Sequence, residues 1–175
     1  PWQIAMGLDA LEKALAAYPD GFFDQLCYGS ITRLQIELVG ALTGREGMDN
    51  LTSASAFVQE MADYQLMAAD ITQVNAGSYY HEIAHMIDNR LSWEVLIRED
   101  APFSEEAWQA LQPEGFTYAY SYTEMPEDVA NYAYTSGYFV QEYSCTYPTE
   151  DRATMMESAM TDATYDFDQN PGLLP

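Results

Sequence analysis

The chain has 175 residues, 48% of them hydrophobic, which is enough for one domain with a hydrophobic core. Its 28 acidic residues against six basic ones give a formal charge of −22. A surface this negative disfavours nucleic acid and anionic membranes as partners, and no apolar run reaches the roughly 18 residues of a membrane-spanning helix.

The charge leaves two interpretations open: it serves solubility in a salty or extracellular setting, or it selects cationic substrates. We expect one domain over residues 1–175, and the missing initial Met suggests a piece excised from a longer protein. Scarce lysine and high acidity are typical of a secreted protein or one at a bacterial cell surface. The oligomeric state is not readable from the sequence.

The N-terminal half predicts a helix followed by strands. Residues 4–18 carry apolar side chains at spacings of three and four, and "YPDGF" then ends the helix. Alternation of apolar and polar residues predicts strands at 31–38 and in parts of 54–71, separated by a loop, "TGREGMDN". The apolar stripe expected for the first helix consists of Ile4, Leu8, Leu11, Leu15 and Tyr18.

A second helix is predicted through "AGSYYHEIAHMIDNRL", with Asn75 as its N-cap. Farther on, Ser104 is a candidate cap for a helix within residues 103–113. Two Pro-introduced segments follow, "MPEDVANYAY" and "YPTEDRATMMESAM". The second predicts the better helix, capped by Thr149, with acids in its first turn and an acidic tail after it. Its apolar stripe would be Ala153, Met156, Ala159 and Met160.

The chain's only two histidines, His81 and His85, stand four residues apart in "HEIAH". On a helix they project from one face and can bind one tetrahedral ion, with Glu82 beside them. This is the HExxH pattern of zinc peptidases. Zinc with two His ligands, one carboxylate and an open position lowers the pKa of its bound water, and Glu82 is the candidate general base.

The third ligand must lie elsewhere, because Asp88 and Leu91 stand where a metzincin has Gly and His. Asp88 is either an acid that orients a neighbouring group or a solvated acid at the helix end. Two downstream glutamates, Glu127 and Glu150, are each followed by an aspartate that could accept a hydrogen bond from a ligand imidazole. Helix quality favours Glu150, because a ligand should be held rigidly.

With these residues the chain resembles gluzincin-type bacterial zinc metallopeptidases that share a short catalytic domain with anthrax-lethal-factor-like proteases. The resemblance rests on "HEIAHMID" and "GYFVQEYSCTYPTEDRATMMESAM" and covers roughly residues 64–160. It implies zinc bound by His81, His85 and Glu150. It departs at "EDRAT", where many relatives read "EDxAE", so any role of that second glutamate is missing.

The resemblance also implies that Glu82 is the general base and that Tyr143, seven residues before Glu150, hydrogen-bonds the oxyanion. A packing role for Tyr143 stays open. It further implies that "DYQLMAADI" is the strand at the cleft edge, where an extended substrate would add by main-chain pairing. An ordinary sheet strand fits the same residues.

We therefore expect an α+β zincin-like domain with a small twisted sheet over the HExxH helix and a mainly helical C-terminal part. The expected activity is zinc-dependent endopeptidase hydrolysis of a peptide or protein, and a cationic substrate would fit the acidic charge. The alternative is a non-catalytic zinc-binding module that keeps the fold. Cys27 and Cys145 are too few for a cysteine-based metal site, and either two thiols or one long-range disulfide fits them.

Overall fold

The computed structural model describes residues 2–42, 54–135 and 137–161. The expected loop at 43–50 and the acidic tail at 162–175 lie outside the described residues. Contacts divide the chain into two compact units, Pro1–Trp93 and Glu94–Pro175, and each is described by itself. The single domain therefore stays a prediction. None of the helices in the described ranges is long and apolar enough to cross a membrane.

The first unit contains a mixed three-stranded sheet, as the α+β prediction requires. Its strands are β1 (Arg33–Val39), β2 (Ala56–Glu60) and β3 (Tyr64–Asp70), in the order β1-β3-β2. β1 pairs in parallel with β3, and β2 pairs antiparallel with it. The predicted strands at 31–38 and within 54–71 are confirmed.

The position of β3 contradicts the expected cleft-edge strand. β3 is the central strand, and every residue from Tyr64 to Asp70 has a partner in β1. Its other side pairs with β2 from Gln65 to Ala69. Because its main-chain groups are used on both sides, β3 cannot accept an added peptide strand. Among the strands in the described part of the chain, only β1 and β2 have an outer edge to which a further strand could add.

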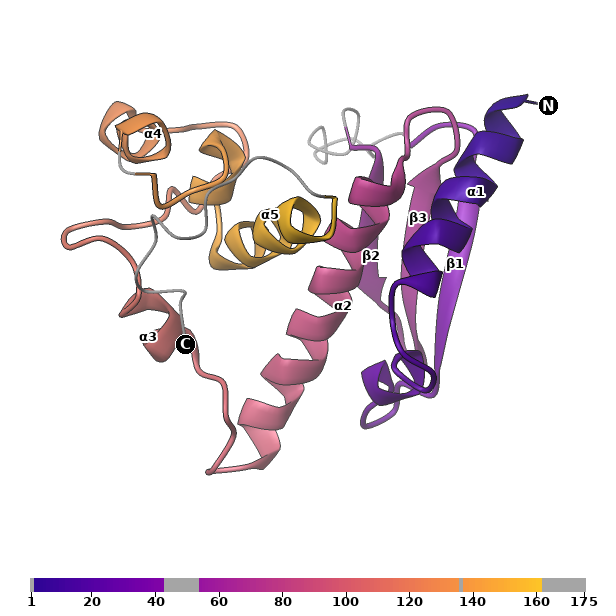
Figure 1. Cartoon of the computed structure of the whole chain (residues 1–175). Coiled ribbons are helices and arrows are strands. Elements are labelled where there is room, and N and C mark those ends of the chain that lie inside the picture. Colours follow the sequence, from indigo (N-terminus) through magenta and orange to yellow (C-terminus); the bar gives the residue numbers. More distant parts are fainter. Residues whose placement is uncertain (1, 43–53, 136, 162–175) are drawn as a thin grey trace. The chain divides into compact units, whose positions relative to one another are not determined.

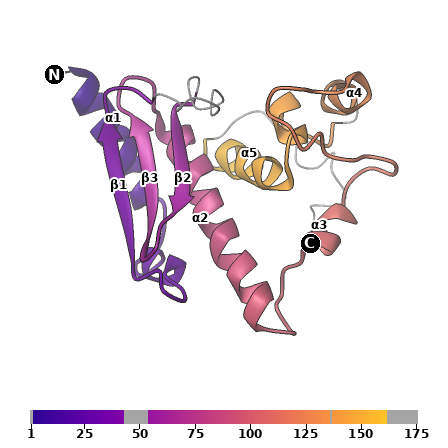
Figure 2. The same ribbon diagram turned by 180° about the vertical axis from the view of Figure 1, so that it is seen from behind.

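Two helices, α1 (Trp2–Ala16) and α2 (Ala76–Ile97), lie on the same face of this sheet, as opposite views show (Figures 1 and 2). The buried core includes residues of β3 and of the adjoining turns of α2: Met67, Ala68, Ala69, Tyr79, Tyr80, Ile83 and Ala84. A long helix therefore presents its N-terminal half to the sheet.

The buried side of α1 differs from the predicted apolar stripe. Ile4 and Leu8 are exposed, and the buried residues of the helix are Gly7 and Ala14. A Cβ atom at Gly7 would overlap Cδ1 of Ile71, and the Tyr79 hydroxyl donates to the Gly7 carbonyl over 3.3 Å. The helix thus packs closely through its small residues, which a count of large apolar side chains does not detect.

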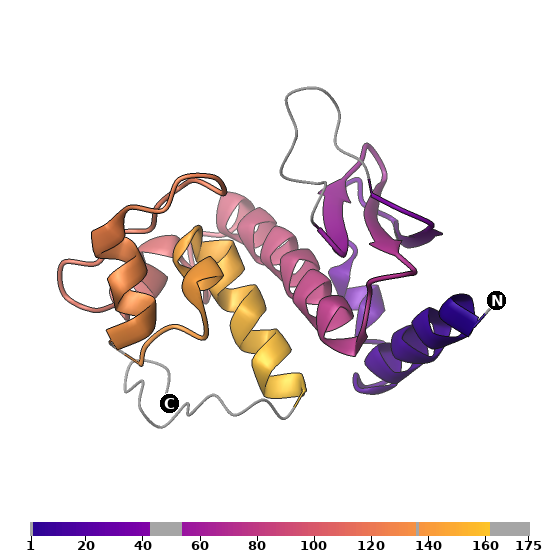
Figure 3. The same ribbon diagram turned by 90° about the horizontal axis from the view of Figure 1, so that it is seen from above.

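The second unit is mainly helical, as expected. It contains α3 (Glu105–Gln109), α4 (Glu127–Thr135), the 3₁₀ helix η3 (Glu142–Cys145) and α5 (Pro148–Met160). η3 contacts both α4 and α5 (Figure 3). The unit's hydrophobic core is formed by Phe116, Tyr118, Val129, Phe139 and Cys145.

The helix caps were predicted with mixed success. Ser104 caps α3, since its Oγ accepts from the Ala107 N–H over 3.0 Å. Thr149 is not the cap of α5. The helix begins two residues earlier than that cap implies, with Tyr147 in the extended N-cap position and Pro148 in the first turn. Proline favours this place because the first N–H groups of a helix have no partner within it.

The buried side of α5 is largely polar, and of the predicted apolar stripe only Ala153 is fully buried. Ala159 is exposed, whereas Asp151, Thr154 and Ser158 are buried together with Glu150 and Ala153. Hydrogen bonds compensate for part of this burial: the hydroxyls of Thr154 and Ser144 lie 2.7 Å apart, whereas Ser158 Oγ has no hydrogen-bond partner among the described residues. A hydrogen-bonded helix face of this kind does not show as hydrophobic periodicity.

Candidate metal centre

The HExxH segment lies in the N-terminal half of α2, whose start is fixed by reciprocal hydrogen bonds. Asn75 Oδ1 accepts from the Ser78 N–H over 3.2 Å, and the Asn75 N–H donates to Ser78 Oγ over 3.4 Å. The predicted N-cap is therefore confirmed. α2 then runs to Ile97, so the histidines stand on an uninterrupted helix.

His81 and His85 lie next to each other on this helix. Their ring centroids are 4.9 Å apart and the ring planes meet at 78°. Both side chains are half-buried, which leaves part of each ring accessible. The predicted pairing of two imidazoles on one helix face is confirmed.

Hydrogen bonds to the sheet fix the orientation of α2 about its own axis. Gln65 of β3 is fully buried; its Nε2 donates to the Leu26 carbonyl, and its Oε1 accepts from Asn89 Nδ2, each over 3.0 Å. Asn89 lies four residues after His85, one turn along the helix. This link to the sheet limits how far the histidine-bearing face can turn.

Two acids of α2 near the histidines are buried. Glu82 is 6% exposed and Asp88 is 5% exposed. Asp88 is neither solvated nor at the helix end, because α2 continues for more than two turns beyond it, and that alternative is wrong. Its orienting role stays a prediction. A buried carboxylate is costly unless partners or a metal compensate it, so both acids point to polar chemistry on this helix.

In the second unit, Glu150 is a buried carboxylate in the first turn of α5. Its Oε1 accepts a hydrogen bond from the Tyr122 hydroxyl over 2.8 Å. Sequence reasoning did not single out Tyr122, which lies 28 residues before Glu150. The only signal for it was the local density of tyrosines in "YAYSY". Tyr122 thus fixes one oxygen of the candidate ligand.

Asp151, next to Glu150, anchors the same turn to the core. Its Oδ2 accepts from the Tyr118 hydroxyl over 2.7 Å and from Gln112 Nε2 over 3.4 Å. The Trp108 indole N–H donates to the Tyr118 hydroxyl over 3.0 Å. Burial raises the pKa of Asp151 to about 7, and the Tyr118 hydrogen bond opposes that rise. The expected bond from a ligand imidazole to Asp151 stays a prediction.

The two candidate third ligands differ in their surroundings. Glu127 begins α4 and is exposed, whereas Glu150 is 4% exposed and held by Tyr122. Holding a carboxylate in one orientation is what a metal ligand requires. These contacts favour Glu150 over Glu127, as helix quality did.

Tyr143 lies on η3 beside Tyr122, the hydrogen-bond partner of Glu150. Its ring stacks with that of Tyr122, with centroids 6.1 Å apart and planes at 28°. Its side chain is exposed. An exposed ring is not what a packing role alone would need. The oxyanion role of Tyr143 stays a prediction.

By their chemistry, His81, His85 and Glu150 form a group that could hold a metal ion. The histidines belong to the first unit and the glutamate to the second, so their joint action on one ion is a proposal developed below. Cys27 and Cys145 form no disulfide with each other.

Comparison of the chain with protein-family models, curated proteins and solved structures gives no match. The resemblance to lethal-factor-like peptidases, and the zincin fold that it implies, therefore stay predictions from the residues.

Proposed function

We propose that the protein is a zinc-dependent endopeptidase whose metal is bound by His81, His85 and Glu150. The observation that carries this proposal is the donor set itself: two adjacent imidazoles on α2 and a buried, oriented carboxylate on α5, in a group that could hold a metal ion.

The donor set fits zinc. Two imidazoles and one carboxylate are the protein ligands of one common class of catalytic zinc site, and they leave a position open for substrate. The Tyr122 hydroxyl supports Glu150, as an outer-shell partner of a ligand carboxylate does. No comparable support is described for the exposed Glu127.

Zinc, when bound, supplies Lewis-acid polarisation of the scissile carbonyl and acidifies water at the open position. Glu82 then accepts a proton from the attacking water and delivers it to the departing amide nitrogen. The water oxygen bonds to the carbonyl carbon first, which places negative charge on the carbonyl oxygen. The C–N bond breaks afterwards, and the proton ends on the new amine. In this proposal the Tyr143 hydroxyl donates to the oxyanion.

We further propose a peptide or protein substrate encountered outside the cell or at a bacterial surface. The formal charge of −22 supports this setting and argues against nucleic acid as a partner. It also supports a preference for cationic peptides, because an acidic surface attracts positive charges and repels negative ones.

The test is peptide turnover by zinc-loaded protein, with Glu82→Gln as the informative variant. It should keep its zinc and its circular-dichroism spectrum while turnover falls at least about 100-fold, the scale of a lost general base. Glu106→Gln, an exposed change of the same charge on α3, is the matched control and should cleave normally. Zinc binding with no turnover by the wild type would instead indicate the non-catalytic binding module.

A further inference from the structure

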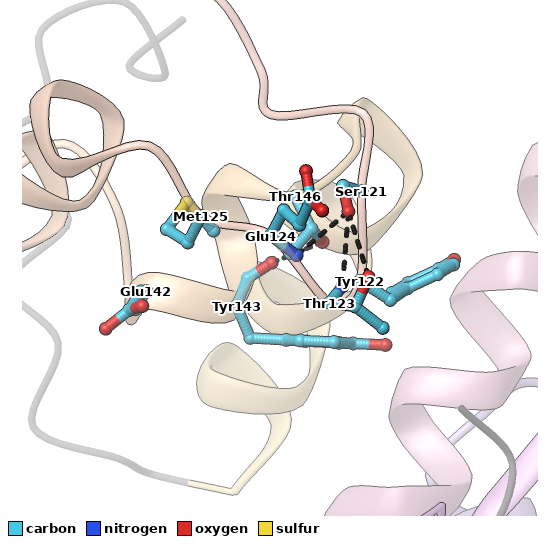
Figure 4. Close-up of a pocket in the computed structure, with 8 residues that line it drawn as sticks. All are labelled: Ser121, Tyr122, Thr123, Glu124, Met125, Glu142, Tyr143 and Thr146. Atoms are coloured by element: carbon cyan, nitrogen blue, oxygen red, sulfur yellow. Dashed lines mark hydrogen bonds between the residues drawn. The ribbon is translucent and has the colours of Figure 1, made fainter. Parts of the chain in front are cut away.

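The second unit has a pocket of about 330 Å³ beside Tyr143 (Figure 4). Two chain segments, 121–125 and 142–146, form its walls. This volume is at the lower end of the range for ligand sites, which suits one amino-acid side chain better than a large ligand. The lining residues are Ser121, Tyr122, Thr123, Glu124, Met125, Glu142, Tyr143 and Thr146.

Hydrogen bonds hold the walls together. The Ala119 N–H donates to the Cys145 carbonyl over 2.9 Å, and the Tyr120 N–H donates to the Thr146 carbonyl over 2.8 Å. Within the first wall, Ser121 Oγ accepts from the N–H groups of Thr123 and Glu124 over 3.2 and 3.0 Å. The pocket is therefore largely formed before any ligand enters, which lowers the ordering cost of binding.

The lining combines negative charge with aromatic and thioether surface. Glu124 and Glu142 each carry a carboxylate, and the eight lining residues include no basic one. Figure 4 shows Glu142 and Met125 at one end of the pocket and Tyr122 at the other. The stacked rings of Tyr122 and Tyr143 supply the aromatic surface.

Such a lining matches one class of ligand. A guanidinium can pair with carboxylates, lay its flat face on a tyrosine ring and rest its methylene stem on apolar atoms. An anionic side chain would be repelled by both glutamates, and a small apolar one would gain nothing from their negative charge.

We propose that this pocket binds the arginine side chain of a peptide substrate. The inference rests on the proposed peptidase function, because Tyr122 both lines the pocket and donates to Glu150. Only the Tyr122 side chain would separate a peptide anchored here from Glu150, the candidate zinc ligand. The net charge alone does not say where on the protein a cationic peptide binds. In this proposal the positive side chain binds in the pocket.

The binding test uses metal-free protein, with its methionine methyl groups labelled with ¹³C and the Met125 signal assigned through Met125→Leu. The probes are acetyl-arginine methylamide and acetyl-citrulline methylamide, which share a shape but differ in charge. We expect the arginine probe to shift the Met125 signal and to bind about tenfold more tightly than the citrulline probe. This is the effect of two partly exposed ion pairs with an aromatic contact.

Variants locate the charge. Glu142→Gln and Glu124→Gln should each weaken binding of the arginine probe about three- to fivefold without changing the citrulline probe. Glu106→Gln removes the same charge from an exposed position on α3, away from the pocket lining, and should leave both affinities unchanged. Equal binding of the two probes, an unmoved Met125 signal, or equal weakening by Glu106→Gln overturns the proposal.

A second arm separates this proposal from the peptidase proposal. In zinc-loaded protein, kcat/KM for a peptide with arginine should exceed that for its citrulline analogue, and Glu142→Gln should remove most of the difference. If the arginine probe binds in the pocket but no peptide is cleaved, the peptidase proposal fails and the pocket stands. Cleavage with no arginine preference and no Met125 shift rejects the pocket alone.

Discussion

Removing the Tyr122 hydroxyl tests whether Glu150 is a metal ligand held by its neighbour. The hydroxyl donates to Glu150 Oε1 over 2.8 Å, and the ring keeps its contacts with Tyr143 and Tyr147 in Tyr122→Phe. A hydrogen bond to a charged group contributes about 1.5–3 kcal/mol when buried. Because Tyr122 is exposed, we expect the lower end, which corresponds to about a tenfold loss of zinc affinity.

The assay is competition for zinc against a chromophoric chelator at fixed pH and salt. Tyr120→Phe is the matched control: it removes a hydroxyl from the same tyrosine cluster, and no hydrogen bond of that hydroxyl is described. The control should retain wild-type affinity. If Tyr122→Phe binds zinc as tightly as the wild type while its unfolding midpoint is unchanged, the Tyr122 contact does not support a ligand.

Two further predictions concern stability and substrate charge. The Tyr18 hydroxyl is buried with no hydrogen-bond partner among the described residues, so Tyr18→Phe should raise the free energy of unfolding by about 1 kcal/mol at pH 7. Burial, followed by repulsion from Tyr80, raises the pKa of Tyr18 to about 12. Ionisation of Tyr18 therefore leaves the free energy of unfolding of the wild type unchanged below about pH 10 and lowers it as the pH rises to about 12. Urea unfolding at pH 7 and 11 should show the advantage of Tyr18→Phe widening, and a constant difference would contradict the burial argument. Separately, any advantage of cationic over neutral peptides in kcat/KM should shrink as salt shortens the Debye length from about 10 Å at 0.1 M to about 3 Å at 1 M; equal cleavage at low salt would leave the acidic surface to solubility alone.

Local patterns predicted the histidine helix well. The spacing of apolar residues and the capping side chain of Asn75 are both properties of neighbouring residues, and both appear in α2. The strand segments follow from alternation in the same way. The pairing of His81 with His85 required only that the helix form.

Features that depend on distant residues were missed. Alternation locates β3 but does not say which strands flank it, so its central position was not predicted. The bond from Tyr122 to Glu150 joins residues far apart in the chain. The polar buried face of α5 depends on the partners that Tyr118 and Ser144 provide. α1 packs through Gly7, whose lack of a side chain gives no hydrophobic signal.

The most direct test of the proposed site is zinc content per chain, measured by elemental analysis after dialysis against a buffer with a weak chelator. The wild type and Glu127→Gln should each retain one zinc per chain, because Glu127 is exposed and not a ligand in this account. Glu150→Gln and His85→Ala should lose it while keeping their helical content. Full zinc occupancy in Glu150→Gln together with loss in Glu127→Gln would contradict the proposed ligand set.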